Sequence, residues 1–89
     1  MQKGYLINQY EMQIGLQQIA EYQDEAVALL DEEEPMENNL RRAYHYHGMA
    51  QSVLILLRGL ELISISDFGK VFNKQLEISE RINELWEER

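Results

Sequence analysis

One short segment, the acidic run at residues 31–34 followed by Pro35, constrains the fold of this chain more than any other. Pro35 is the only proline among 89 residues, and the four consecutive acids before it repel one another. Because proline disfavours α-helical geometry in the residue before it, a helix that reaches this segment has to end there. Proline is well tolerated as the first residue of a helix, so Pro35 predicts the start of a second helix.

A second boundary is marked by a capping box, in which Ser64 is followed three residues later by the carboxylate of Asp67. Ile63 and Phe68 flank this cap at the spacing of a hydrophobic staple. The two boundaries predict three helices, at about residues 5–30, 35–62 and 65–86. Because the connections are short, we expect an all-α, three-helix antiparallel bundle that forms a single domain over residues 1–89, with two long helices plus a C-terminal helix.

Each predicted helix carries an apolar stripe at helical spacing. The members of these main stripes are Tyr5, Met12, Leu16, Ile19, Ala26 and Leu30, then Met36, Leu40, Ala43, His47, Ala50, Leu54 and Leu57, then Phe68, Phe72, Leu76, Ser79, Ile82 and Trp86 or Leu85. The first two helices also carry a second apolar set on another face. Three helices can bury one stripe each, so we expect the second set to meet another chain, most simply a second copy in a two-fold homodimer.

The candidate oligomer or partner interface consists of Ile7, Tyr10, Ile14, Val53, Leu56 and Leu60. The alternative is that these are scattered surface apolar residues, which are normal on monomers. Gly48, Gly59 and Gly69 lie inside predicted helices, where glycine costs stability, so each is expected to permit close helix approach or contact with a partner.

The net charge of −8 comes from the first part of the chain, because residues 1–37 hold nine acids and one lysine. A candidate acidic binding surface for a basic partner consists of Glu21, Asp24, Glu25, Asp31, Glu32, Glu33 and Glu34. Such a surface repels nucleic acid and anionic lipid, so we expect no direct nucleic-acid or membrane partner. The alternative is that the acids only keep the protein soluble.

Motifs for catalysis are weak. His45 and His47 are two residues apart, which is about 200° around a helix, so one chain cannot use both on a single metal. We expect His47 to be a hydrogen-bonded core or interface residue and His45 to lie at the surface or an interface. A Glu-Glu-x-x-Glu spacing ending at Glu37 is interrupted by Pro35. With no cysteine either, we expect no enzyme, cofactor or metal site; a metal-dependent hydrolase using the acidic stripe is the remote alternative.

No secretory signal and no apolar run long enough for a membrane span is found, so a cytoplasmic location is expected. In size, charge and predicted helicity the chain resembles the small acidic helical accessory proteins of phages and mobile elements, including anti-CRISPR and immunity proteins. The resemblance implies a protein-interaction module that inhibits or adapts a host protein through an acidic surface. The alternative is a structural, assembly or chaperone-like dimer that holds a partner helix in an apolar groove.

Overall fold

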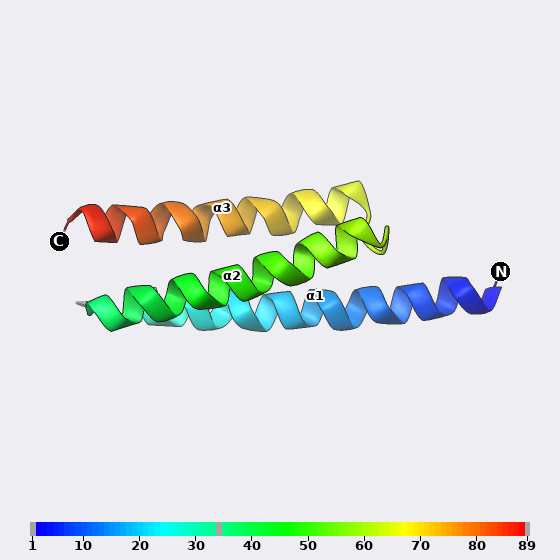
Figure 1. Cartoon of the computed structure of the whole chain (residues 1–89), viewed down its shortest axis with the longest axis horizontal. Helices are drawn as coiled ribbons and strands as arrows, with labels where there is room; N and C mark the ends of the chain where they lie inside the picture. Colours follow the sequence, from blue (N-terminus) through cyan, green and yellow to red (C-terminus); the bar gives the residue numbers. More distant parts are fainter. Residues whose placement is uncertain (1, 34, 89) are drawn as a thin grey trace.

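Three helices form an antiparallel bundle that measures 53 × 17 × 16 Å. A computed structural model describes the backbone of residues 2–33 and 35–88 and the side chains of residues 10–33 and 35–88. The helices are α1 (Gln2–Leu30), α2 (Glu37–Gly59) and α3 (Ile65–Glu87), and no strand occurs within these ranges. Figure 1 shows that α2 runs antiparallel to both neighbours and that the first turns of α1 extend beyond the α2–α3 turn. The predicted all-α antiparallel bundle is confirmed.

The start of α2 differs from the prediction. Pro35 is not helical, and Met36, in an extended conformation with ψ of 160°, is the N-cap, so the first helical residue is Glu37. The extended residues let the chain reverse direction between α1 and α2. As a result Met36 leaves the predicted buried stripe and is 68% exposed. Asn39 in the first turn of α2 donates a hydrogen bond to the Leu29 carbonyl at 3.3 Å, which satisfies an acceptor at the end of α1.

The end of α2 is also earlier than predicted, at Gly59 rather than near Leu62, because Glu61 adopts a left-handed conformation with φ of 57°. The Leu62 N–H donates to the Leu57 carbonyl at 2.8 Å, and the Glu61 N–H donates to the Arg58 carbonyl at 3.1 Å. These are the two hydrogen bonds of a Schellman motif, with glutamate at the position where glycine is usual. The motif ends the helix and turns the chain into α3.

The predicted cap of α3 is confirmed. The Ser64 hydroxyl accepts a hydrogen bond from the Asp67 backbone N–H at 3.1 Å, and the Ser64 backbone is extended. Ile63 and Phe68 pack against the same apolar cluster, as the staple pattern predicts. The α2–α3 turn is therefore specified from both sides by local hydrogen bonds.

Two apolar clusters fill the bundle, one toward each end. The first, at the α1–α2 turn, contains Ala26, Leu29, Leu30, Leu40, Ala43, Ile78 and Ile82. The second, toward the α2–α3 turn, contains Ile19, Ala50, Leu54 and Leu57. The main stripes predicted for the first two helices supply most of both clusters. Burial of these side chains is the principal stabilising contribution to the bundle.

A polar layer, which the sequence analysis did not anticipate, crosses the bundle between these clusters. Gln75 is 2% exposed, and its amide nitrogen donates to the His47 carbonyl at 3.1 Å and to Gln51 Oε1 at 3.0 Å. Its amide oxygen accepts a hydrogen bond from Gln23 Nε2 at 3.0 Å. His47 Nε2 lies 3.1 Å from the Gln75 carbonyl, which can only accept, so this nitrogen carries the proton. One glutamine thus joins all three helices.

The buried face of α3 is rotated from the predicted one. Gln75, Ile78 and Ile82 are buried, whereas Phe72 and Leu76 are exposed. Trp86 is 37% exposed, and Leu85 instead packs against the first cluster. The prediction was wrong for Phe72 and Leu76 because it left Gln75 out of the core, whereas the hydrogen bonds of Gln75 allow this polar residue to be buried there.

The glycine that permits close helix approach is Gly15, which the sequence analysis did not single out. A Cβ on Gly15 would lie 2.9 Å from both Cδ atoms of Leu57. A Cβ on Gly48, Gly59 or Gly69 would meet no described atom of another helix within 4 Å, so the expectation of close helix approach within this chain was wrong for all three. Gly15 brings α1 and α2 together near the α2–α3 turn.

Candidate functional site

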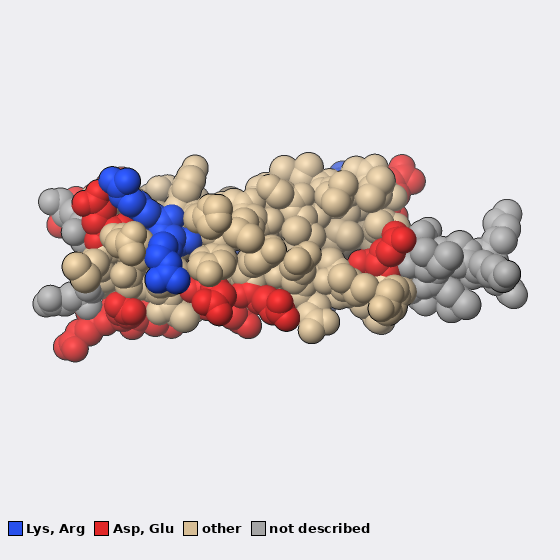
Figure 2. Space-filling view, turned by 60° about the horizontal axis from the view of Figure 1, so that its bottom comes forward, with Lys and Arg blue, Asp and Glu red and all other residues tan. Residues whose placement is uncertain are grey.

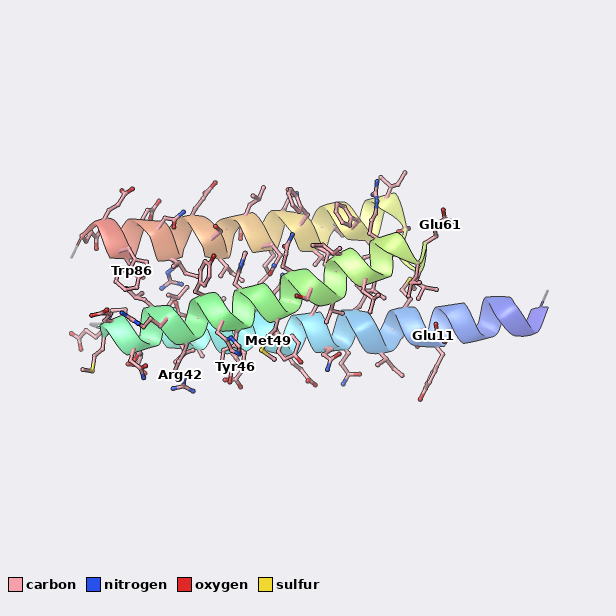
Figure 3. The ribbon with its side chains drawn as sticks, viewed as in Figure 1. Glu11, Arg42, Tyr46, Met49, Glu61 and Trp86 are labelled. Carbon is pink, nitrogen blue, oxygen red and sulfur yellow. The ribbon has the colours of Figure 1, made fainter. Side chains whose placement is uncertain are left out.

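The α1–α2 face, defined as the outer surface of these two helices away from α3, carries side chains that are exposed or only partly covered by the core. On α1 these side chains follow each other at alternating spacings of three and four residues, at Glu11, Ile14, Gln18, Glu21 and Glu25. On α2 the same alternation links Arg42, Tyr46, Met49, Val53, Leu56 and Leu60. In Figure 3, Arg42, Tyr46 and Met49 point to the same side of α2. Such alternation is typical of a helix seam that packs against another helix.

An apolar groove lies at the end of this face near the α2–α3 turn. It encloses about 260 Å³ and is lined by Glu11, Ile14, Gly15, Gln18, Val53, Leu56, Leu57, Leu60 and Leu62. Leu56 is 59%, Leu60 58% and Ile14 48% exposed. This volume is smaller than the roughly 300–1,000 Å³ of most small-molecule pockets. The groove therefore suits a few apolar side chains of another protein.

The structure brings together most of the apolar residues that the sequence analysis proposed as an interface. Ile14, Val53, Leu56 and Leu60 all line the groove, although they come from two helices. Tyr10 precedes Ile14 by four residues on α1 and is 65% exposed. The side chain of Ile7 lies outside the described residues. Gly15 explains why the groove is continuous, because it lets α1 lie close to Leu57.

The other end of the α1–α2 face is charged. Glu21, Asp24 and Glu25 are exposed on α1, and Arg42 is exposed at the start of α2. The neighbouring Arg41 is paired with Glu37 at 2.6 Å and lies beside Trp86 of α3. Figure 2 shows acidic side chains along the lower edge of this view, basic side chains beside them at the left, and a broad uncharged middle. Within the described part of the chain, neither Arg42 nor the three α1 acids form an ion pair. These charges are available to another molecule.

The acids of the α1–α2 turn differ from those of α1. Asp31 forms an ion pair with Arg81 of α3, with Oδ1 and Nη1 2.6 Å apart. Arg81 also donates from Nη2 to the Leu30 carbonyl at 2.9 Å. The Arg81 side chain therefore caps α1 and also neutralises the charge of Asp31. Glu32 and Glu33 are exposed, and Glu34 lies outside the described residues. Asp31 therefore has a structural role in addition to being a candidate site residue.

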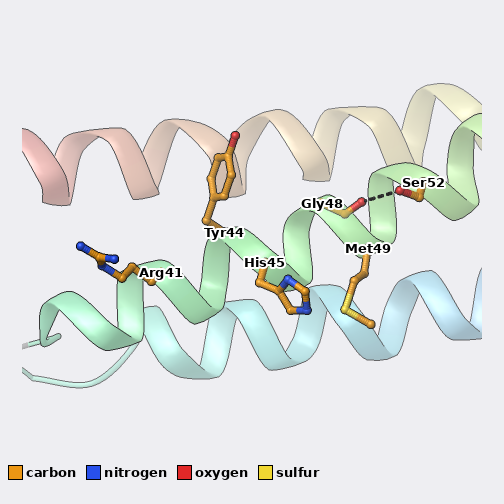
Figure 4. A pocket seen from close by; sticks show the side chains of 6 residues that line it. All are labelled: Arg41, Tyr44, His45, Gly48, Met49 and Ser52. Carbon is orange, nitrogen blue, oxygen red and sulfur yellow. Dashed lines mark hydrogen bonds between the residues drawn. The ribbon is translucent and has the colours of Figure 1, made fainter.

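The two histidines lie in different surroundings, as predicted. His47 is half-buried in the polar layer, whereas His45 is exposed. His45 lines a shallow hollow on the outer side of α2, together with Arg41, Tyr44, Gly48, Met49 and Ser52 (Figure 4). The only hydrogen bond drawn among these residues runs from the Ser52 hydroxyl to the Gly48 carbonyl at 3.0 Å, which is a local helix contact. All six residues belong to one helix, so this hollow is open.

Among the described residues, no three His, Asp or Glu side chains converge in a way that could hold a metal ion. None of the helices, over the same residues, is long and apolar enough to cross a membrane. No protein-family model, curated protein or solved structure matches the chain. The α1–α2 face, apolar at one end and charged at the other, is the candidate site.

Proposed function

We propose that this protein is a protein-interaction module, without catalytic activity, that binds another protein chain through the α1–α2 face. The observation that carries this proposal is the groove, where Ile14, Leu56 and Leu60 from two helices expose apolar surface around one hollow. Contiguous exposed apolar surface of this kind is typical of protein-binding sites. An amphipathic helix laid along the face would place its apolar residues in the groove.

The charged end supports a specific role for this module, namely the inhibition or adaptation of a host protein. Glu21, Asp24 and Glu25 are exposed on one stretch of α1 and have no cationic partner within the described residues. A partner with basic residues beside its apolar anchor would be guided to the face by these acids. Because the charges are exposed, this part of the affinity should fall as ionic strength rises.

Affinity capture with matched baits tests the proposal. We expect the natural chain and a Lys70→Glu control to capture the same host protein. The Leu56→Glu variant should fail to capture it. Lys70 is exposed on α3, away from the face, and Leu56 is exposed enough for the substitution to leave the fold intact. Changing Glu21 and Glu25 together to glutamine should weaken capture at low salt more than at high salt. Capture that is equal for all baits would contradict the proposal.

A further inference from the structure

The charged and apolar regions of the α1–α2 face are arranged so that the face complements itself. We propose that its occupant is a second copy of this chain, related by a two-fold axis that runs parallel to the helices. In this arrangement α2 of each copy lies against α1 of the other, and Arg42 of each copy meets Glu25 of the other. The inference rests on the part of the proposed function that makes the α1–α2 face a protein-binding surface, and it names a second copy rather than a host protein as the occupant.

Two contacts within one copy establish which residues of α1 and α2 lie at the same height along the bundle. The rings of Tyr22 and Tyr46 are 6.3 Å apart, and Glu25 and Arg42 lie one turn beyond this contact on their own helices. Since each residue of a helix advances about 1.5 Å, Glu25 and Arg42 differ in height by roughly one residue. At the other end, Gly15 lies against Leu57, so Ile14 is level with the segment between Leu56 and Leu60.

A two-fold axis parallel to the bundle preserves these heights and exchanges α1 with α2 across the interface. It therefore places the basic start of α2 opposite the acidic stretch of α1 in the second copy. It also places Leu56 and Leu60 opposite Ile14, so that apolar surface meets apolar surface. Figure 2 allows this to be followed, because turning the face over about its horizontal axis lays the blue region against the red one.

An axis perpendicular to the helices gives no such match. It would lay the charged end of one copy over the groove of the other, where exposed leucines would remove the water around Glu21 and Glu25. Burying carboxylates without partners is unfavourable. In the parallel-axis arrangement every helix–helix contact across the interface is antiparallel, and the alternating spacings of three and four residues on both helices suit such packing.

The pairing of Arg42 with Glu25 is tested by charge reversal in the full chain, with the dimer dissociation constant measured by sedimentation. Arg42→Glu and Glu25→Arg should each weaken the dimer about tenfold or more, because each places like charges opposite one another at two symmetric sites. The double variant recreates both pairs in reverse and should return the dissociation constant to within a few-fold of the natural value. Lys70→Glu on α3 serves as the control and should leave it unchanged.

The possible outcomes separate this inference from the proposed function. Rescue by the double variant supports the arrangement. A dimer that Leu56→Glu disrupts but that both charge reversals leave unchanged overturns the axis. A chain that stays monomeric while the face binds a different protein one-to-one overturns the second copy as occupant and leaves the proposed function standing. If the chain stays monomeric, and the variants of the α1–α2 face capture other proteins as well as the natural chain does, both the inference and the proposed function are overturned.

Discussion

Gln23 Nε2 of α1 donates a hydrogen bond to Gln75 Oε1 of α3 across 3.0 Å, in a layer that separates the two apolar clusters of the bundle. The two residues are 52 positions apart in the chain and are 5% and 2% exposed. No buried side-chain nitrogen or oxygen among the described residues lacks a hydrogen-bond partner. The layer therefore fixes how the three helices are aligned, because sliding any one of them would leave buried amide groups unpaired.

Replacing Gln75 by methionine should lower the free energy of unfolding by about 1–3 kcal/mol. Gln23 Nε2 then loses the nearer of its two acceptors and keeps only the Val71 carbonyl at 3.4 Å, while the His47 carbonyl and Gln51 Oε1 lose the donor that Gln75 supplies. The double variant Gln23→Met/Gln75→Met should lose less than the sum of the single variants, since both amide groups are then absent. Urea denaturation followed by circular dichroism measures these values. Gln17→Met, at an exposed position of α1, is the control, and strict additivity would contradict the coupling.

Alanine at two glycines should have opposite effects on stability. Gly48→Ala adds a Cβ in open space and should raise the free energy of unfolding by about 0.5–1 kcal/mol through helix propensity. Gly15→Ala adds a Cβ 2.9 Å from buried Leu57, whose side chain then has to move. This substitution should lower the free energy of unfolding by about 1 kcal/mol. Thermal unfolding of the two variants provides the comparison. Equal stabilisation by both would mean that α1 and α2 are not in close contact at Gly15.

Glycine at position 61 should stabilise the protein. Glu61 has φ of 57°, a conformation that costs a residue with a Cβ about 1–2 kcal/mol. Glu61→Gly removes this cost but adds freedom to the unfolded chain, so a net gain of about 0.5–1 kcal/mol is expected. Glu61→Ala retains the Cβ and should not reproduce the gain in a denaturation experiment. If alanine stabilised as much as glycine, the backbone conformation would not be the cause.

Arg81 should contribute more to stability through its hydrogen bond to the Leu30 carbonyl than through its ion pair with Asp31. Both charged side chains are about half exposed, so Asp31→Asn should cost less than about 0.5 kcal/mol. Arg81→Met removes the cap of α1 as well and should cost about 1 kcal/mol. Denaturation at low and high salt separates the two contributions. The effect of Asp31→Asn should vanish at high salt, whereas most of the Arg81→Met effect should remain.

Helix boundaries were largely predictable because their signals are local. The Ser64 cap operates over three residues, so its hydrogen bond follows from the sequence there. Pro35 correctly indicated a break, but the first helical residue depended on how the chain reverses, and only the structure placed it at Glu37. Glu61 carried no signal, because glutamate gives no indication of a left-handed residue.

The apolar members of the candidate site could be predicted, but their arrangement could not, and Arg42 was not among the predicted site residues. The surplus of apolar residues at Ile14, Val53, Leu56 and Leu60 follows from helical periodicity within each helix. Their convergence on one groove depends on the relative height of α1 and α2, which the contact at Gly15 decides. The buried glutamines are a separate case. Gln23 and Gln75 occupy core positions of their helices, so helical periodicity applied to polar as well as apolar residues could have placed both on the buried faces.

The sequence by itself determined that this chain forms three helices, which two short segments separate them, and that its acids are concentrated near α1. These properties depend on residues a few positions apart, whose interactions do not require the rest of the fold. Only the tertiary structure decided which face of α3 is buried, that Gln75 joins all three helices, and that Arg81 caps α1. These contacts link residues 28–52 positions apart, and their geometry exists only once the helices have packed.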